Sequence, residues 1–214
     1  MKFFSRNCLV TTVTHSVNVS PAAPEVHLPR ELPFMDGYYR IARQPRISDI
    51  FSAVQGSDQR DYAIDLFRQA YARQMQGEYE EALRLYARSI QAFPTAEAYT
   101  FRGWTYSFMG VWDKAIRECL KAIEIDPDFG NPYNDIGAYL IEQGKFDEAL
   151  PWFEKALRAP RYEAYCYPWF NMGRIWEKKH DWTKARACYE KSLEQNPNYQ
   201  VAIIALKKLK AMWN

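Results

Sequence analysis

Cysteine and histidine are the residues of this 214-residue chain whose side chains most readily bind metals or act as nucleophiles. They are Cys8, Cys119, Cys166, Cys188, His15, His27 and His180. No two cysteines form a Cys-x-x-Cys pair, and no histidine lies at metal-ligand spacing from a cysteine or from another histidine. We therefore expect free thiols, no metal site and a reducing compartment.

A phosphate-binding loop would be a second kind of chemistry, and the sequence does not support one. The segment Asp128-Phe129-Gly130-Asn131-Pro132 lacks the Gly-Lys-Ser/Thr that such a loop requires. Pro132 suits the first turn of a helix instead. We expect a protein that is not an enzyme, with no cofactor and no small-molecule substrate.

Charge and hydrophobicity bound the kinds of partner. The chain has 28 Lys and Arg residues against 26 Asp and Glu residues, a net charge of +2. This balance argues against a nucleic-acid binder that relies on a concentrated basic field. No apolar run approaches the roughly 20 residues of a membrane-spanning helix, so we expect no transmembrane segment. The 48% apolar and 16% aromatic content is ample for a buried core and for a surface that a partner covers.

The first 45 residues differ in composition from the rest and are expected to form an extended arm. Residues 1–24 contain no Asp or Glu and are rich in Ser and Thr, which is typical of an organelle transit segment but equally of a disordered terminus. The β-branched stretch from Leu9 to Val19 could alternatively lie as a strand along a partner's sheet edge. Five of the twelve prolines fall between Pro21 and Pro45, which predicts an extended spacer.

A short helical lead-in is expected over residues 46–62, where Ser48 can cap a turn, Gly56 ends it, and Ser57 or Asp58 opens a long amphipathic helix. Helical periodicity then continues to Trp213 and contains a repeat. The repeated blocks are Gly-Glu-Tyr-Glu-Glu-Ala (77–82), Gly-Val-Trp-Asp-Lys-Ala (110–115), Gly-Lys-Phe-Asp-Glu-Ala (144–149) and His-Asp-Trp-Thr-Lys-Ala (180–185). A small residue stands seven places before each block (Ala70, Gly103, Gly137 and Gly173).

This pattern resembles the tetratricopeptide repeat (TPR), a helix-turn-helix unit of about 34 residues. The resemblance implies an all-α fold, a right-handed α-α superhelical solenoid of about four units with a C-terminal capping helix. The units cover about 63–95, 96–129, 130–165 and 166–198, and the capping helix covers 199–214. His180 replaces the turn glycine of the fourth unit and is expected to be a solvent-exposed turn residue. Cys119 takes an aromatic packing slot, which favours a buried small hydrophobe over a nucleophile.

In this family the first helix of each unit lines the concave face, so the resemblance also implies which residues contact a partner. They are Phe67, Tyr71, Phe101, Trp104, Asn134, Asp135, Tyr167, Phe170, Asn171, Arg174 and Lys178. Large rings beside amide side chains suit a groove for an extended peptide, because the rings supply buried area and asparagine fixes the peptide backbone. An alternative stays open, in which some rings pack against the neighbouring unit or the arm.

The carboxylate clamp of chaperone-binding TPR proteins is not matched. Its slots read Phe67, Tyr71, Phe101, Asn131 and Asp135, or one unit later Thr100, Trp104, Asp135, Tyr167 and Asn171. An aspartate where a cation is needed would repel a terminal carboxylate, so an adaptor for chaperone tails is not expected.

Two functions follow, and both are non-enzymatic. The first is a structural or assembly subunit of a larger complex, in which the solenoid docks other protein subunits. The second is a free peptide-binding adaptor or co-chaperone that recruits extended segments. Nucleic acid is not expected to bind except indirectly, within a complex. The composition of residues 1–24 makes the mitochondrion the first expectation for location and the cytoplasm the alternative.

Overall fold

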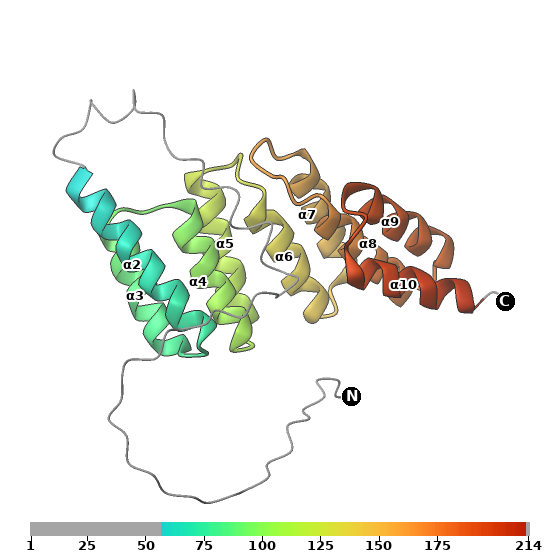
Figure 1. Ribbon diagram of the computed structural model, residues 1–214, viewed down its shortest axis with the longest axis horizontal. Helices are drawn as coiled ribbons and strands as arrows, with labels where there is room; N and C mark the ends of the chain where they lie inside the picture. Colours follow the sequence, from blue (N-terminus) through green and yellow to red (C-terminus); the bar gives the residue numbers. More distant parts are fainter. Residues whose placement is uncertain (1–56, 213–214) are drawn as a thin grey trace, which may run out of the picture. The chain divides into compact units, whose positions relative to one another are not determined.

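The computed structural model describes residues 57–212, which all belong to one compact unit. Within this range the chain forms nine α-helices and no β-strand (Figure 1), so the predicted all-α fold is confirmed. The helices are α2 (Ser57–Met75), α3 (Tyr79–Ala92), α4 (Ala96–Phe108), α5 (Trp112–Ile125), α6 (Asn131–Glu142), α7 (Phe146–Arg158), α8 (Cys166–Lys178), α9 (Trp182–Gln195) and α10 (Gln200–Ala211). The predicted arm over residues 1–45 and most of the predicted lead-in lie outside the described residues.

The helices pack as consecutive pairs, α2 with α3, α4 with α5, α6 with α7 and α8 with α9, and α10 packs on α9. Each pair approaches closely where its first helix carries a small residue. A Cβ atom added to Gly137 would lie 2.7 Å from the ring of Phe153, and one added to Gly103 would lie 3.0 Å from the carbonyl oxygen of Ala115. The small residues that recur in the sequence are therefore the contact points of the pairs.

The turn inside each pair places one residue in the left-handed backbone region. The φ angles are 79° at Gly77, 72° at Gly110, 76° at Gly144 and 59° at His180. Glycine adopts this region at no steric cost, whereas a residue with a Cβ atom is strained there. His180 is exposed, which confirms the prediction of a solvent-exposed turn residue.

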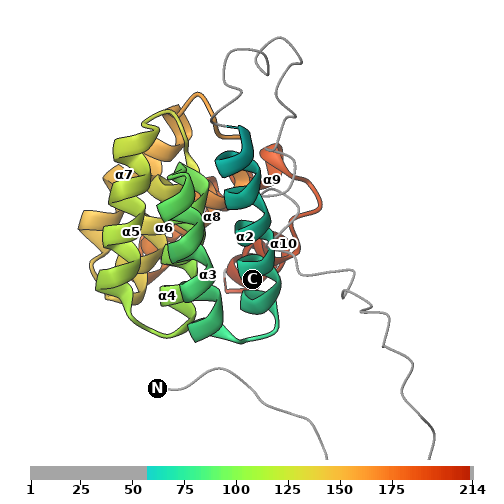
Figure 2. The same cartoon turned by 90° about the vertical axis from the view of Figure 1, so that its left-hand side faces the viewer.

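The first helices of successive units form the inner layer of the array. Helix α2 contacts α4, α4 contacts α6, and α6 contacts α8. The second helices make no comparably close contact with one another within residues 57–212. Because the first helices lie closer together, their side forms the concave face of the solenoid, and Figure 2 shows the array from its end.

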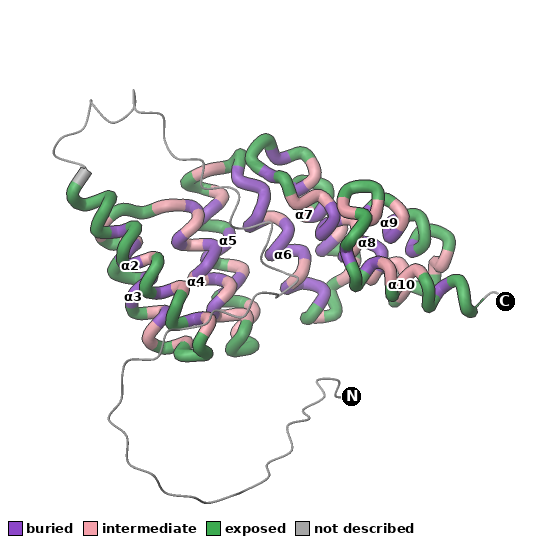
Figure 3. The backbone as a smooth tube through the Cα atoms, viewed as in Figure 1, coloured by how far each residue is buried: buried purple, intermediate pink, exposed green. Residues whose placement is uncertain are grey.

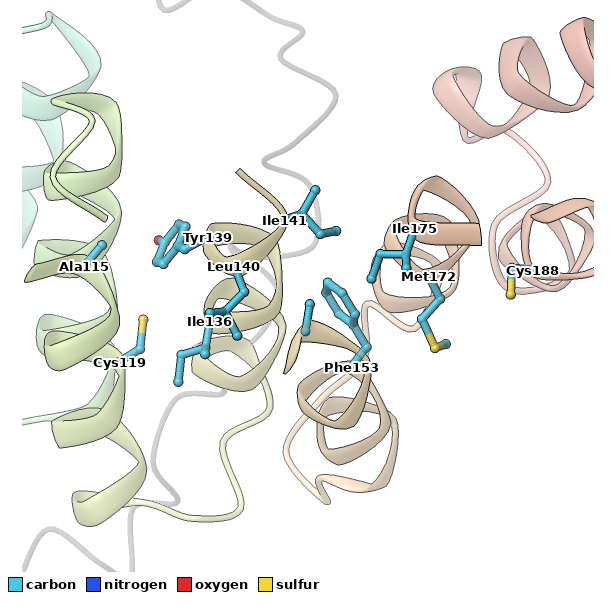
Figure 4. Packing of buried hydrophobic residues seen from close by; sticks show 11 residues of the cluster. Ala115, Cys119, Ile136, Tyr139, Leu140, Ile141, Phe153, Met172, Ile175 and Cys188 are labelled. Atoms are coloured by element: carbon cyan, nitrogen blue, oxygen red, sulfur yellow. The ribbon is translucent and has the colours of Figure 1, made fainter. Parts of the chain in front are cut away.

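The largest core cluster runs through the middle of the array. It joins Ala115 and Cys119 of α5 to Ile136 and Tyr139 of α6, and continues to Phe153 of α7 (Figure 4). Figure 3 shows buried positions recurring along each helix as expected for a stacked array. Burial is the main cause that raises the pKa of the Cys119 thiol, so this side chain is a protonated, buried small hydrophobe as predicted.

The connection between α7 and α8 reaches back to the preceding unit. The backbone N–H of Arg161 donates to the carbonyl of Asp128 at 2.9 Å, and the N–H of Gly130 donates to the carbonyl of Arg161 at 3.1 Å. The Arg161 guanidinium also pairs with Asp126 and, at 2.8 Å, with Glu97 of α4. This segment therefore ties the third unit to the second at the edge where the first helices begin.

Candidate functional site

The candidate site is the inner face, which we define as the surface formed by the first helices α2, α4, α6 and α8. Its first half is aromatic. The ring of Phe101 on α4 lies 5.1 Å from Phe67 and 5.7 Å from Tyr71, both on α2, and 5.6 Å from Trp104. All three pairs meet edge to face, an arrangement that aromatic rings prefer. The structure thus brings the four predicted aromatic residues of this half together.

Burial divides these rings into a base and an outer part. Phe101 is buried, whereas Phe67, Tyr71 and Trp104 are half-buried. The row continues from Trp104 to Phe108 at 5.2 Å, and Phe108 is 47% exposed. Phe101 therefore joins α2 to α4 as a packing residue, as the open alternative allowed, and the rings around it supply accessible apolar surface.

The second half of the inner face is a ribbon of hydrogen-bonded amide and charged side chains. Nδ2 of Asn171 donates to Oδ1 of Asn134 at 3.4 Å, and Nδ2 of Asn134 donates to Oδ1 of Asp135 at 3.4 Å. Arg174 donates to Oδ1 of Asn171 at 3.3 Å and to Oε1 of Glu142 at 3.0 Å. We call these five residues the amide half. It spans α6 and α8 and contains four of the predicted residues.

Two properties of the amide half suit a peptide backbone. Hydrogen bonds of 3.4 Å are near the limit of the usual range and are weak, so the two asparagines lose little when they turn to a ligand. Each asparagine can donate and accept at once, which matches the alternating N–H and C=O groups of an extended chain. Asn134 and Asn171 are buried, so a ligand must exchange their existing hydrogen bonds rather than add to them.

Asp135 brings a negative charge into the middle of this face. The Asp135 side chain is buried. The pKa values of Tyr139 and Tyr162 are raised mainly by the burial of these two tyrosines, and the negative charge of Asp135 is the second-largest cause. Both tyrosines are therefore neutral at physiological pH. The field of Asp135 favours a cation and disfavours a carboxylate at this point of the inner face.

The remaining predicted residues have other neighbours. The ring of Tyr199, just before α10, lies 5.3 Å from Tyr167 and 5.3 Å from Phe170. The structure thus assigns these two rings to packing of the capping helix, and their part in partner binding stays a prediction. Lys178 lies exposed at the last position of α8. Sequence reasoning missed Glu142, although it occupies the same repeat slot as Lys178 and Phe108.

A depression of about 360 Å³ lies away from these predicted residues, between α5, α6 and α7. Its lining includes the apolar side chains of Ile116, Leu140 and Trp152 and the charged side chains of Asp113 and Lys145. Nothing in its lining resembles a catalytic or metal-binding arrangement.

No group of three His, Cys, Asp or Glu side chains in residues 57–212 lies close enough to hold a metal ion. Cys119, Cys166 and Cys188 are buried free thiols, as predicted. Within the same residues, every helix is too short or too polar to cross a bilayer.

Comparison with known proteins gives further evidence on the fold. The chain is 36% identical over 83 residues to sperm-associated antigen 1 of Rattus norvegicus, which is 39% of this chain and 9% of that protein. It is 32% identical over 138 residues to Hsp70-Hsp90 organizing protein 3 of Arabidopsis thaliana, which is 64% of this chain and 24% of that protein. The matches thus span less than a third of the length of these relatives.

Solved structures show the same architecture. PilF of Pseudomonas aeruginosa superposes with a TM-score of 0.65 at 21% identity, over 72% of this chain and 68% of that one. PilW, a type IV pilus biogenesis factor, superposes with a TM-score of 0.64 at 24% identity, over 70% and 69% of the two chains. At these identities the likeness concerns the fold alone.

Family models described as tetratricopeptide repeats match residues 66–96, 96–129, 118–150 and 166–199. These matches cover most of the described helices. Three of them agree with the pairs α2–α3, α4–α5 and α8–α9, and the match over 118–150 runs from α5 through α6 into α7. Repeats of this family build protein-protein interaction scaffolds. By sequence and by structure, this chain belongs to the tetratricopeptide-repeat family.

Proposed function

We propose that this chain is a non-catalytic assembly or structural subunit that holds an extended segment of a partner protein on its inner face. The observation that carries the proposal is the arrangement of two complementary surfaces on one row of helices. Aromatic rings of α2 and α4 are followed by the amide half on α6 and α8. A partner segment that runs along the row meets apolar anchors first and hydrogen-bonding amides next.

The rings supply the affinity and the amides supply the register of this interaction. Half-buried aromatic side chains beside a buried packing ring are typical of residues that dominate binding energy, because a partner completes their burial. The paired asparagines add directional bonds that only an extended backbone can satisfy in series. Asp135 selects against a segment that presents a carboxylate at this point.

A mitochondrial location is part of this proposal and is supported by the composition of residues 1–24, which lie outside the described residues. The test is cell fractionation combined with mapping of the mature N-terminus. Recovery of a shortened chain in the mitochondrial fraction is the expected result. A full-length chain in the cytosolic fraction would refute this part of the proposal.

A free peptide-binding adaptor or co-chaperone is the second candidate. It is favoured by the similarity to proteins named Hsp70-Hsp90 organizing protein in Arabidopsis thaliana and in Glycine max. Size-exclusion chromatography with light scattering on material from the native source separates the two candidates. Stable co-elution with other subunits supports the assembly subunit, and a monomeric chain supports the adaptor.

The inner face itself is tested with two matched tryptophan variants. Trp104 on α4 and Trp152 on α7 are both half-buried, but only Trp104 lies on the inner face. We expect Trp104→Ala to weaken capture of the native partner by about tenfold or more, since central aromatic residues often contribute over 1 kcal/mol. Trp152→Ala should capture the partner as the unsubstituted chain does. Equal loss in both variants would show that the inner face is not the partner surface.

A further inference from the structure

The chain carries, in the sequence before α2, a segment whose chemistry matches the inner face. Residues 34–46 read Phe-Met-Asp-Gly-Tyr-Tyr-Arg-Ile-Ala-Arg-Gln-Pro-Arg and lie outside the described residues. The segment carries three aromatic rings, Phe34, Tyr38 and Tyr39, followed by three arginines, Arg40, Arg43 and Arg46. Its last seven residues contain no acidic side chain. It thus has an aromatic part and a basic part, in that order.

We propose that residues 34–46 occupy the inner face of their own chain and compete there with the partner segment. The inference rests on the proposed function, because it assigns an internal competitor to the same surface. The aromatic part of the segment would lie against Phe67 and Trp104, and an arginine would lie near Asp135.

The first argument is the match of chemical groups. The half-buried rings of Phe67, Tyr71 and Trp104 offer apolar surface to Phe34, Tyr38 and Tyr39. Edge-to-face contacts of this kind already connect the rings of α2 and α4.

The second argument is charge and hydrogen bonding at the amide half. Glu142 is engaged by Arg174 at 3.0 Å, and the charge of Asp135 reaches Tyr139 and Tyr162. An arginine favours a site beside such a carboxylate, and its planar group can also donate to an asparagine oxygen. Pro45 has no backbone N–H, and its carbonyl oxygen is an acceptor that the Nδ2 group of Asn134 or Asn171 can satisfy.

The third argument is reach. Eleven Cα–Cα steps separate Arg46 from Ser57, where α2 begins. An extended chain of that length spans up to about 36 Å. Neighbouring packed helices are about 8–10 Å apart, so α6 lies on the order of 20 Å from α2. The arginines can therefore reach the amide half where the chain before Ser57 is extended, because a helix of the same length would span only about 16 Å.

Tethering makes such a contact effective even when it is weak. A short flexible connection gives an effective concentration on the order of millimolar. An external segment then binds with an apparent Kd equal to its intrinsic Kd divided by the fraction of chains whose inner face is free. A partner segment would thus bind the inner face only if its affinity is high enough to displace the tethered segment.

The test compares two full-length chains, the unsubstituted one and one in which residues 34–46 are replaced by a Gly/Ser linker of equal length. The probe is a fluorescently labelled synthetic peptide of residues 30–50. We expect the peptide to bind the linker chain at least about tenfold more tightly than the unsubstituted chain. Adding Trp104→Ala to the linker chain should weaken binding about tenfold or more, whereas Trp152→Ala should not. Circular dichroism confirms that all chains are folded.

Several outcomes would overturn the inference. The first is that the peptide binds the two chains with equal affinity, and the second is that it does not bind the linker chain. The third is that a peptide with Arg40, Arg43 and Arg46 changed to Gln binds the linker chain as tightly as the unsubstituted peptide. A concentration-dependent dimer that disappears in the linker chain would show exchange between copies, which also contradicts occupation of the same chain.

Failure here is distinguishable from failure of the proposed function. If partner capture requires Trp104 while the peptide does not bind the linker chain, only the internal competitor is wrong. If the peptide binds as expected while partner capture is insensitive to Trp104→Ala, the proposed function is wrong and the inner face serves its own segment alone.

Discussion

The hydroxyl of Tyr189 on α9 donates a 2.7 Å hydrogen bond to Oε2 of Glu177 on α8. The first unit repeats this pair at the same repeat positions, with the hydroxyl of Tyr86 donating to Oε1 of Gln74 at 2.9 Å. The third unit has Phe153 where the tyrosines stand, and Ile141 where their acceptors stand. In these three units, a polar ring therefore occurs together with a polar acceptor, and an apolar ring with an apolar neighbour.

This pairing predicts the effect of exchanging the rings. Tyr189→Phe should lower the free energy of unfolding by about 1 kcal/mol through loss of one hydrogen bond. The reverse change, Phe153→Tyr, should lower it by about 1–3 kcal/mol, because the new hydroxyl is buried beside Ile141 without an acceptor. Urea denaturation measures both. Adding Ile141→Gln to Phe153→Tyr should recover part of the loss, and failure to do so would contradict the pairing.

Gly137→Ala tests the closest approach within the third unit. Alanine normally stabilises a helix by about 1 kcal/mol relative to glycine. Here the added Cβ atom would lie 2.7 Å from the Phe153 ring, so we expect a net loss of about 1–3 kcal/mol from overpacking. Denaturation of Gly137→Ala, Phe153→Leu and the double variant forms a thermodynamic cycle. The double variant should be more stable than the sum of the single effects, and strict additivity would show that the two side chains do not meet.

His180 tests the backbone of the fourth turn. Its φ of 59° is strained for a residue with a side chain, so His180→Gly should raise the free energy of unfolding by up to about 1 kcal/mol. Gly144→Ala makes the opposite change, from glycine to a residue with a Cβ atom, at a φ of 76°. No atom lies within 4 Å of the added Cβ, so any loss of stability would come from backbone strain. Thermal denaturation of both variants should show shifts of opposite sign. Shifts of the same sign would refute the assignment of strain to the turn.

Alkaline pH should destabilise the fold. Burial raises the pKa of Cys188 from an ordinary value of 9.0 to about 11, and raises those of Tyr139 and Tyr162 well above 10.0. These groups stay protonated in the folded chain while the unfolded chain ionises. Their stabilisation is therefore complete below pH 9 and is lost as the pH rises through the folded-state values.

The measurement is the free energy of unfolding from pH 8 to 11, which should fall once the pH exceeds about 9. Cys188→Ala should show a smaller fall between pH 9 and 11 than the unsubstituted chain, because it removes one of the linked protons. A free energy of unfolding that stays constant over this interval would contradict the burial of these groups.

Much of the helical array is predictable from residues close together in the sequence. The glycine at each turn and the small residue seven places before it recur at a regular spacing, and each acts within its own helix pair. Cys119 was predictable as a buried residue because its slot is aromatic in the other units. The two halves of the inner face were likewise visible as aromatic positions on α2 and α4 and amide positions on α6 and α8.

Other features depend on contacts between residues far apart in the chain. Arg161 bonds to Glu97 across 64 positions, and no periodicity connects the two. Arg174 is engaged by Glu142 of the preceding unit, and Tyr167 and Phe170 turn toward Tyr199.

The fold class, the turns and the row of helices that presents a surface follow from the amino-acid sequence, because they depend on side-chain size and backbone preference within one repeat. Three features are visible only in the folded chain: which rings of that row are packing residues, which charges are already paired, and how the connection between α7 and α8 binds back to the second unit. Those outcomes depend on the distance between adjacent units, and that distance is set by how the units stack rather than by any single repeat.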